Sequence, residues 1–154
     1  MKRVALVTGA ARGIGKSIAT DLARDHGLAI TYRSSDPADL LNLYPGTLAI
    51  KTDFTRPDTA QQVIDAVLSK YGRVDTLVLN AGAISAEDSP DASDVVQVNL
   101  WANDALLKAA VPHLRPGSCV VAISSINAIL PALSAVLYSA SKAASDHLVR
   151  AWAE

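Results

Sequence analysis

The sequence predicts an α/β fold in which a parallel β-sheet is covered by helices on both faces. Short apolar segments alternate along the chain with longer segments whose apolar residues have helical spacing. The apolar run at residues 74–79 shows no polar alternation, as expected for a strand that is buried on both faces. Right-handed crossovers between such strands make the sheet doubly wound, and we expect the strand order 3-2-1-4-5.

Five short apolar runs are the expected strands, and each ends where turn or polar residues begin. They cover residues 4–8, 28–32, 47–52, 74–79 and 118–124. The sequence contains no repeat, low-complexity tract or linker. We therefore expect residues 1–154 to form a single domain.

Helices are expected between these strands and after the last one. They cover residues 14–24, 37–43, 57–71 and 92–114, and a final helix runs from about residue 133 to the chain end. Gly27 is expected to end the first helix, because glycine tolerates a left-handed residue there. Pro57 suits the start of the third helix, and Pro112 falls in the last turn of the fourth.

A glycine-rich turn joins the first strand to the first helix, with the sequence Thr8-Gly9-Ala10-Ala11-Arg12-Gly13-Ile14-Gly15. Gly9 permits a tight turn, Gly13 lets the backbone approach phosphates, and Gly15 lets the helix pack close to the sheet. The N–H groups at the helix N-terminus favour an anion. The turn therefore predicts a dinucleotide site in a Rossmann-like sheet.

Composition and charge narrow the classes of function. Half of the residues are hydrophobic and 19% are charged, which is typical of a globular protein. The 14 basic and 15 acidic residues leave a net charge of −1 without a basic stripe, so we expect neither nucleic acid nor a membrane as a partner. Cys119 is the single cysteine and is expected to be an inert core thiol. A chain without disulfides favours a cytoplasmic location.

Polar residues follow each strand at the sheet edge where such folds bind ligands. The second strand is followed by Arg33 and Ser34, the third by Asp53 and Phe54, the fourth by Asn80-Ala81-Gly82, and the fifth by Ser124 and Ser125.

The residues after the second strand bear on the choice of nicotinamide nucleotide. An acid in this region usually holds a ribose that lacks a 2′-phosphate, whereas here Tyr32 and Arg33 occupy it. Arg33 and Arg12 could flank a 2′-phosphate, because guanidinium groups match phosphate oxygens. We therefore favour NADP(H), while the nearby Asp36 keeps NAD(H) as the alternative and both arginines could instead be solvated loop residues.

The last helix contains Tyr138 and Lys142 four residues apart, so both side chains share one helix face. A free tyrosine phenol has a pKa of about 10. An ammonium group nearby stabilises the phenolate and makes the phenol a usable proton donor and acceptor nearer neutral pH. No metal-ligand spacing appears around His26, His113 or His147, so we expect no metal.

The chain resembles the short-chain dehydrogenase/reductase family. The resemblance is carried by the glycine turn together with Asp53, Asn80-Ala81-Gly82, Asn99, Ser125, Tyr138 and Lys142, in matching order and approximate spacing. It implies an NADP(H)-dependent oxidoreductase that interconverts a carbonyl and an alcohol of a small molecule. Among family members, the generic features are most similar to 3-oxoacyl-acyl-carrier-protein reductases.

The resemblance also implies roles for single residues. Tyr138 would be the general acid or base, Lys142 would hold the nicotinamide ribose, and Ser125 would stabilise the substrate oxygen. Asn99 would interrupt its helix and hold a water that links Lys142 to solvent, while Asp53 would contact the adenine amino group. The full set expected to contact the cofactor is Gly9, Arg12, Gly13, Ile14, Gly15, Arg33, Ser34, Asp53, Phe54, Asn80, Ala81, Gly82, Tyr138 and Lys142.

The pattern departs from the family at its C-terminal end. The sequence stops inside the helix that carries Tyr138 and Lys142, whereas family members continue through a substrate-covering part, and the connection 82–99 is short. The chain could be the retained part of a longer enzyme, a short form completed by association, or a non-catalytic nucleotide-binding protein. Ser125 could also serve only as a turn cap, and Asn99 only as a helix-face amide. Homo-oligomers, dimers or tetramers, are expected from the family.

Overall fold

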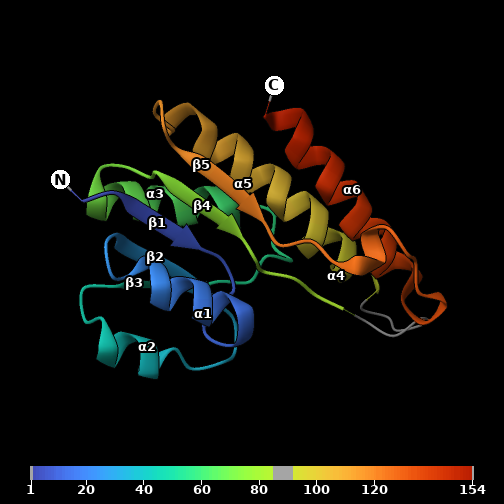
Figure 1. Ribbon diagram of the computed structural model, residues 1–154, viewed down its shortest axis with the longest axis horizontal. Coiled ribbons are helices and arrows are strands. Elements are labelled where there is room, and N and C mark those ends of the chain that lie inside the picture. Colours follow the sequence, from blue (N-terminus) through green and yellow to red (C-terminus); the bar gives the residue numbers. More distant parts are fainter. Residues whose placement is uncertain (1, 85–91, 154) are drawn as a thin grey trace.

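The computed structural model describes residues 2–84 and 92–153, and its centre is a five-stranded parallel sheet (Figure 1). The strand order is β3-β2-β1-β4-β5, which confirms the predicted topology. The strands are β1 (Val4–Val7), β2 (Gly27–Tyr32), β3 (Leu48–Lys51), β4 (Thr76–Leu79) and β5 (Cys119–Ala122).

Two hydrophobic clusters lie on opposite faces of the sheet because successive side chains of a strand point to opposite sides. In β1, Leu6 belongs to the cluster under α3 and α5, whereas Ala5 and Val7 belong to the cluster under α1 and α2. All four residues of β1 are buried, as are those of β4. The carboxyl ends of the strands therefore form one fixed edge on which the polar residues are carried.

One face is covered by α1 (Gly13–Leu22) and the short helix α2 (Ala38–Leu43), as Figure 1 shows below the sheet. The prediction that Gly27 ends the first helix is wrong. The helix stops at Leu22, and Gly27 is already the first residue of β2, without a positive φ. A Cβ at Gly27 would lie 3.4 Å from Cε1 of Tyr71, so this glycine makes room for that ring.

The other face is covered by α3 (Thr59–Tyr71), which ends at a left-handed Gly72, and by the helices that follow β4. The single helix predicted at residues 92–114 is divided into α4 (Ala92–Val96), the π-helical segment η1 (Gln97–Trp101), α5 (Ala102–Ala110) and the 3-10 turn η2 (Val111–His113). The short connection expected at 82–99 includes residues 85–91, which lie outside the described residues.

The chain after β5 passes through two 3-10 turns, η3 (Ile126–Ala128) and η4 (Leu133–Ala135), into α6 (Val136–Trp152). Because β5 is the edge of the sheet, its alternate residues are exposed, and Cys119 is exposed rather than a core thiol. That expectation is therefore wrong. Within the described residues, no helix combines the length and apolarity required to cross a membrane.

Candidate active site

The glycine turn brings β1, α1 and the end of β4 into close contact. A Cβ at Gly9, whose φ is +65°, would lie 2.9 Å from Cα of Ala81. A Cβ at Gly15 would collide with Nδ2 of Asn80 and lie 2.6 Å from the carbonyl oxygen of Gly9. Real Cβ atoms do not approach so closely, so the turn requires glycine at both positions. This agrees with the tight turn and close helix packing expected from the sequence.

Thr8 and Asn80 tie the turn to the end of β4. Oγ1 of Thr8 accepts hydrogen bonds from the backbone N–H groups of Asn80 and Ala81, at 2.9 Å each, and donates to the carbonyl of Val78 at 3.2 Å. Nδ2 of Asn80 donates to the carbonyl oxygens of Thr8 at 2.8 Å and Gly9 at 3.1 Å. The buried Thr8 therefore has an anchoring role that its place in the motif did not by itself reveal.

The N-terminus of α1 opens toward this turn. In the described chain, no side chain caps the helix at Arg12 and no acid stands in its first turn. A Cβ at Gly13, whose φ is +57°, would meet nothing within 4 Å, so the backbone is open to solvent there. Free N–H groups at a helix N-terminus suit the phosphates of a dinucleotide.

A cavity of about 500 Å³, the dinucleotide cavity, extends along the strand ends. It is lined by every residue expected to contact the cofactor except Tyr138 and Lys142. Val98 of η1 and Ile84 also line it, although sequence reasoning assigned them no role. These residues meet at one cavity because parallel strands bring the residues that follow them to one edge of the sheet.

Arg12 and Arg33 supply the positive charge of this cavity, and both are exposed. Asp36, the acid that kept NAD(H) as an alternative, has its carboxylate engaged elsewhere. Its Oδ1 accepts the backbone N–H of Ala38 at 2.9 Å, at the start of α2. An aspartate that accepts the backbone N–H two residues further on forms an Asx turn, which is a common role for this residue. Arg12 and Arg33 line the cavity, whereas Asp36 does not.

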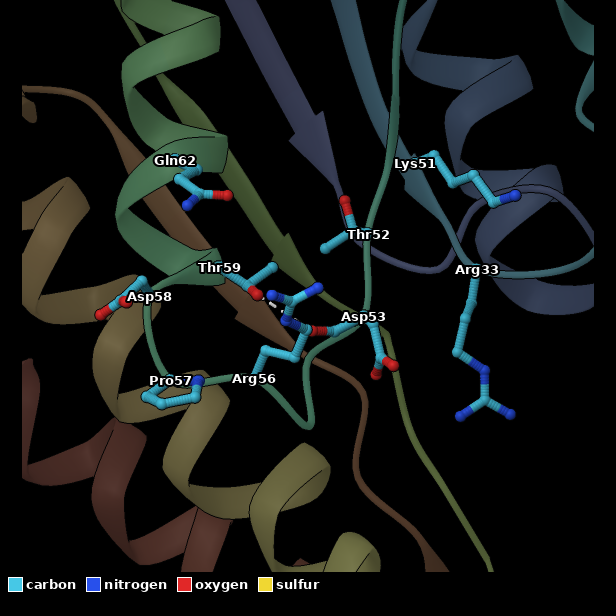
Figure 2. Close-up of a pocket in the computed structure, with 9 residues that line it drawn as sticks. All are labelled: Arg33, Lys51, Thr52, Asp53, Arg56, Pro57, Asp58, Thr59 and Gln62. Carbon is cyan, nitrogen blue, oxygen red and sulfur yellow. Dashed lines mark hydrogen bonds between the residues drawn. The ribbon is translucent and has the colours of Figure 1, made fainter.

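Asp53 lies between the dinucleotide cavity and a second hollow of about 480 Å³, drawn in Figure 2. Its Oδ1 accepts the backbone N–H and the hydroxyl of Thr55, at 3.1 and 2.8 Å. These bonds, aided by the positive charges of Arg33 and Arg56, hold the pKa of Asp53 below its usual range. Figure 2 also shows the Thr59 hydroxyl bound to the Asp53 carbonyl, at 2.9 Å. Asp53 is therefore an oriented, ionised hydrogen-bond acceptor.

Asn99 lies in the π-helical segment η1 and is fully buried. Its Oδ1 accepts the Ala83 N–H at 2.8 Å, and its Nδ2 donates to the Ala83 carbonyl at 2.9 Å. Nδ2 also donates to Oγ of Ser141, at 3.0 Å. The helix is interrupted where the family resemblance implied it. This amide joins the chain after β4 to α6, which a helix-face amide would not do.

Lys142 is nearly buried, and its Nζ donates to the carbonyl of Ile123 at 2.8 Å. Nζ lies 5.9 Å from the centre of the Tyr138 ring, one helical turn earlier on α6. A Cβ at Gly82 would lie 3.7 Å from Nζ, so the ammonium reaches the rim of the dinucleotide cavity. Burial lowers the pKa of Lys142, and the carboxylate of Asp146 opposes this shift.

Ser125 stands between β5 and η3, on the connection that leads toward α6. Its Oγ accepts the Asn127 N–H at 3.2 Å, so it caps the turn. A hydroxyl that accepts one bond still has a proton to donate. Capping and a catalytic role are therefore compatible for this side chain.

Small polar residues of α6 form a seam that the sequence did not reveal. Asn99 binds Ser141, and one turn further Nδ2 of Asn103 binds Oγ of Ser145 at 3.1 Å. The matched spacing of four residues on both helices was the available signal. These two hydrogen bonds fix how α6 is rotated about its own axis. They therefore set the direction in which Tyr138 and Lys142 point.

This doubly wound sheet, with a glycine cradle at its strand ends, defines a nucleotide-binding α/β protein. The chain belongs to the short chain dehydrogenase family, whose model matches residues 3–154.

Named relatives and solved structures agree with that membership. A short-chain dehydrogenase/reductase, FrzI, of a Cladobotryum species is 32% identical over 99% of this chain and 64% of its own length. The 11-beta-hydroxysteroid dehydrogenase-like 2 of Arabidopsis thaliana is 33% identical over 92% of this chain and 51% of its own length. A short chain dehydrogenase from Burkholderia cenocepacia in complex with NADP has a TM-score of 0.86 and 34% identity, over 92% of this chain and 63% of that one. The chain thus spans less than two thirds of each.

Proposed function

We propose that the chain is the dinucleotide-binding and catalytic part of an NADP(H)-dependent oxidoreductase that interconverts a carbonyl and an alcohol. One observation carries the proposal: the Asn99 amide binds Ala83 beside the dinucleotide cavity and Ser141 beside Lys142. A cofactor cradle and a tyrosine–lysine pair are thereby connected by direct contacts. Membership in the short chain dehydrogenase family supports the class of reaction.

The proposed mechanism assigns proton transfer to Tyr138. In reduction, its phenol gives its proton to the carbonyl oxygen, and the resulting phenolate is reprotonated from solvent. A bound NADPH would supply the hydride for the new C–H bond and would be oxidised to NADP in the same step. Ser125 donates a hydrogen bond to the same oxygen, and the Lys142 ammonium stabilises the phenolate. Alcohol oxidation reverses each step.

The cofactor proposal is NADP(H), with NAD(H) as the alternative. Arg12 and Arg33 supply charge for a 2′-phosphate, and Asp36 is engaged with the backbone of Ala38. The complex with NADP of the Burkholderia cenocepacia relative supports the same choice. Asp53 would accept the adenine amino group, and Asn80-Ala81-Gly82 would line the nicotinamide side.

We further propose that residues 1–154 are one domain and that the working protein is a cytoplasmic homo-oligomer.

Asn99 would hold a water that passes protons between Lys142 and solvent. The substrate is expected to be a small carbonyl compound or alcohol, with neither nucleic acid nor a membrane as partner.

A second candidate is a dinucleotide-binding protein without turnover. It is favoured by one finding, that neither Tyr138 nor Lys142 lines the cavity at the strand ends. The described residues that line this cavity lie between Gly9 and Val98, so a dinucleotide could bind there without the tyrosine–lysine pair.

Two measurements on the purified chain separate these candidates. Calorimetry gives the affinity for NADPH, and absorbance at the nicotinamide band follows its oxidation with a panel of ketones and aldehydes. Intact mass of the protein from its natural source establishes the length to be assayed. Binding with turnover supports the oxidoreductase, binding without turnover on any compound supports the second candidate, and no binding contradicts both.

A further inference from the structure

Two side chains of α6, one helical turn apart, reach the end of β5. Nζ of Lys142 donates to the carbonyl of Ile123 at 2.8 Å, and Oδ2 of Asp146 accepts the hydroxyl of Ser124 at 2.7 Å. The two residues bound in this way are consecutive and directly precede Ser125. The end of β5 is therefore bound to α6 at two successive residues. The Lys142 ammonium binds Ile123, and the Asp146 carboxylate binds Ser124.

We propose that Asp146 is a positioning residue, which holds the end of β5 against α6 through Ser124 and steadies the Lys142 ammonium beside Tyr138. The catalytic meaning of this inference rests on the proposed function. The contacts themselves do not, because they involve only residues of this chain.

Ser125 and Tyr138 come from different elements, the connection after β5 and helix α6. The proposed reaction requires both hydroxyls at one substrate oxygen. Their relative placement depends on how β5 meets α6, and the Ser124–Asp146 bond acts one residue before Ser125. Without it, the Lys142–Ile123 bond would be the remaining side-chain tie described between α6 and residues 123–125.

Two opposing influences act on the charge of Lys142. Burial favours the neutral amine and lowers the pKa of Lys142, whereas the carboxylate of Asp146 raises it. The other groups that face Nζ are the Tyr138 ring on the same helix, the Ile123 carbonyl of the β5 end and Gly82 after β4. Among the described residues, Asp146 is therefore the anionic side chain that raises the pKa of Lys142.

Two substitutions separate the effect of the Ser124–Asp146 hydrogen bond from the effect of the negative charge of Asp146. Asp146→Asn keeps an acceptor for the Ser124 hydroxyl but removes the negative charge. Ser124→Ala keeps the charge but removes the tie. Asp65→Asn is the matched control, because Asp65 is an exposed acid on α3 that accepts a bond from Gln61.

The direct test is a pH titration of Lys142 by NMR in the chain labelled with ¹³C-lysine, with Lys142→Arg to assign the signal. Asp146→Asn should lower the titration midpoint of Lys142, because the neighbouring negative charge is lost. Ser124→Ala should lower it less, and Asp65→Asn should leave it unchanged. An unchanged midpoint in Asp146→Asn would overturn the proposal.

The pH profile of turnover supplies a second readout, which a merely structural role would not move. If the ammonium must be charged, activity falls as pH rises through the Lys142 midpoint, so that limb should move to lower pH in Asp146→Asn. A limb that stays in place contradicts the proposal. A wild-type chain that never oxidises NADPH defeats the proposed function, but the NMR titration still decides the role of Asp146.

Discussion

Asn99 closes a ring of two hydrogen bonds with Ala83. Its Oδ1 accepts the Ala83 N–H at 2.8 Å, and its Nδ2 donates to the Ala83 carbonyl at 2.9 Å. This pairing holds the chain beyond β4 against a buried π-helical turn. The remaining Nδ2 proton is donated to Oγ of Ser141. The Asn99 amide therefore connects the chain beside the dinucleotide cavity to the helix that carries Tyr138 and Lys142.

The close approach at Gly15 predicts a large effect for a single methyl group. In Gly15→Ala, the new Cβ would collide with Asn80 and lie 2.6 Å from the Gly9 carbonyl, so α1 must move. We expect a loss of about 1–3 kcal/mol in the free energy of unfolding, together with weaker NADPH binding. Urea unfolding measures the first and calorimetry the second.

Gly46→Ala is the control for this prediction. A Cβ at Gly46 would meet nothing within 4 Å, and its φ is not positive. The change in stability should stay within about 0.5 kcal/mol. Equal effects of the two substitutions would mean that the contact between α1 and Asn80 does not constrain position 15.

Arg33 predicts the cofactor preference. In Arg33→Asp, a carboxylate would repel a 2′-phosphate and could accept ribose hydroxyls instead. Hydrogen bonds to charged groups contribute about 1.5–3 kcal/mol, so the ratio of NADPH to NADH affinity should fall by about 10- to 100-fold. Calorimetry with both nucleotides measures the ratio.

Arg115→Asp makes the same change in charge at an exposed residue near the opposite ends of the strands, before β5. It should leave the ratio unchanged. If Arg33→Asp also leaves it unchanged, Arg33 has no part in cofactor choice.

The buried carboxylate of Asp75 predicts how stability depends on pH. It accepts hydrogen bonds from Nε and Nη2 of Arg73, at 2.8 and 2.6 Å, and from the backbone N–H of Val4, at 2.8 Å. These bonds lower the pKa of Asp75 from its ordinary value of 3.8. Because the folded carboxyl has the lower pKa, its contribution to stability is full above about pH 4 and is lost as the pH falls through the folded value.

Asp75→Asn keeps an acceptor for Val4 and removes the charge. Urea unfolding at pH 7 should show a loss of about 1–3 kcal/mol, which shrinks below pH 4 as the wild-type carboxyl is protonated. Asp65→Asn, on an exposed acid, should show little loss at either pH. A loss from Asp75→Asn that is the same at pH 7 and pH 3 would show that the charge contributes nothing.

The strand order and the cavity-lining residues could be predicted because both follow from regular patterns. Parallel strands read as apolar runs, and their carboxyl ends carry the polar residues to one edge. The interruption of the helix at Asn99 was implied only by the family resemblance. Its π-helical form could not be predicted from periodicity, because apolar residues continue through it with ordinary helical spacing.

Other errors depended on tertiary neighbours. Gly27 is not a helix end but the point where β2 passes the Tyr71 ring. Cys119 is exposed because its face of β5 borders an open hollow beside α1. Asp36 could not be interpreted until its bond to Ala38 was visible. Each depends on which atoms lie nearby in space, and a single sequence does not contain that information.

The most direct test of the account is the rate of NADPH-dependent carbonyl reduction by Tyr138→Phe, with Tyr44→Phe as the matched control. Removing a positioned general acid should lower kcat by about 100-fold or more while the affinity for NADPH stays nearly unchanged. Tyr44 lies at the end of α2, and its substitution should alter neither quantity. Wild-type turnover in Tyr138→Phe would contradict the proton-donor role on which the proposed mechanism depends.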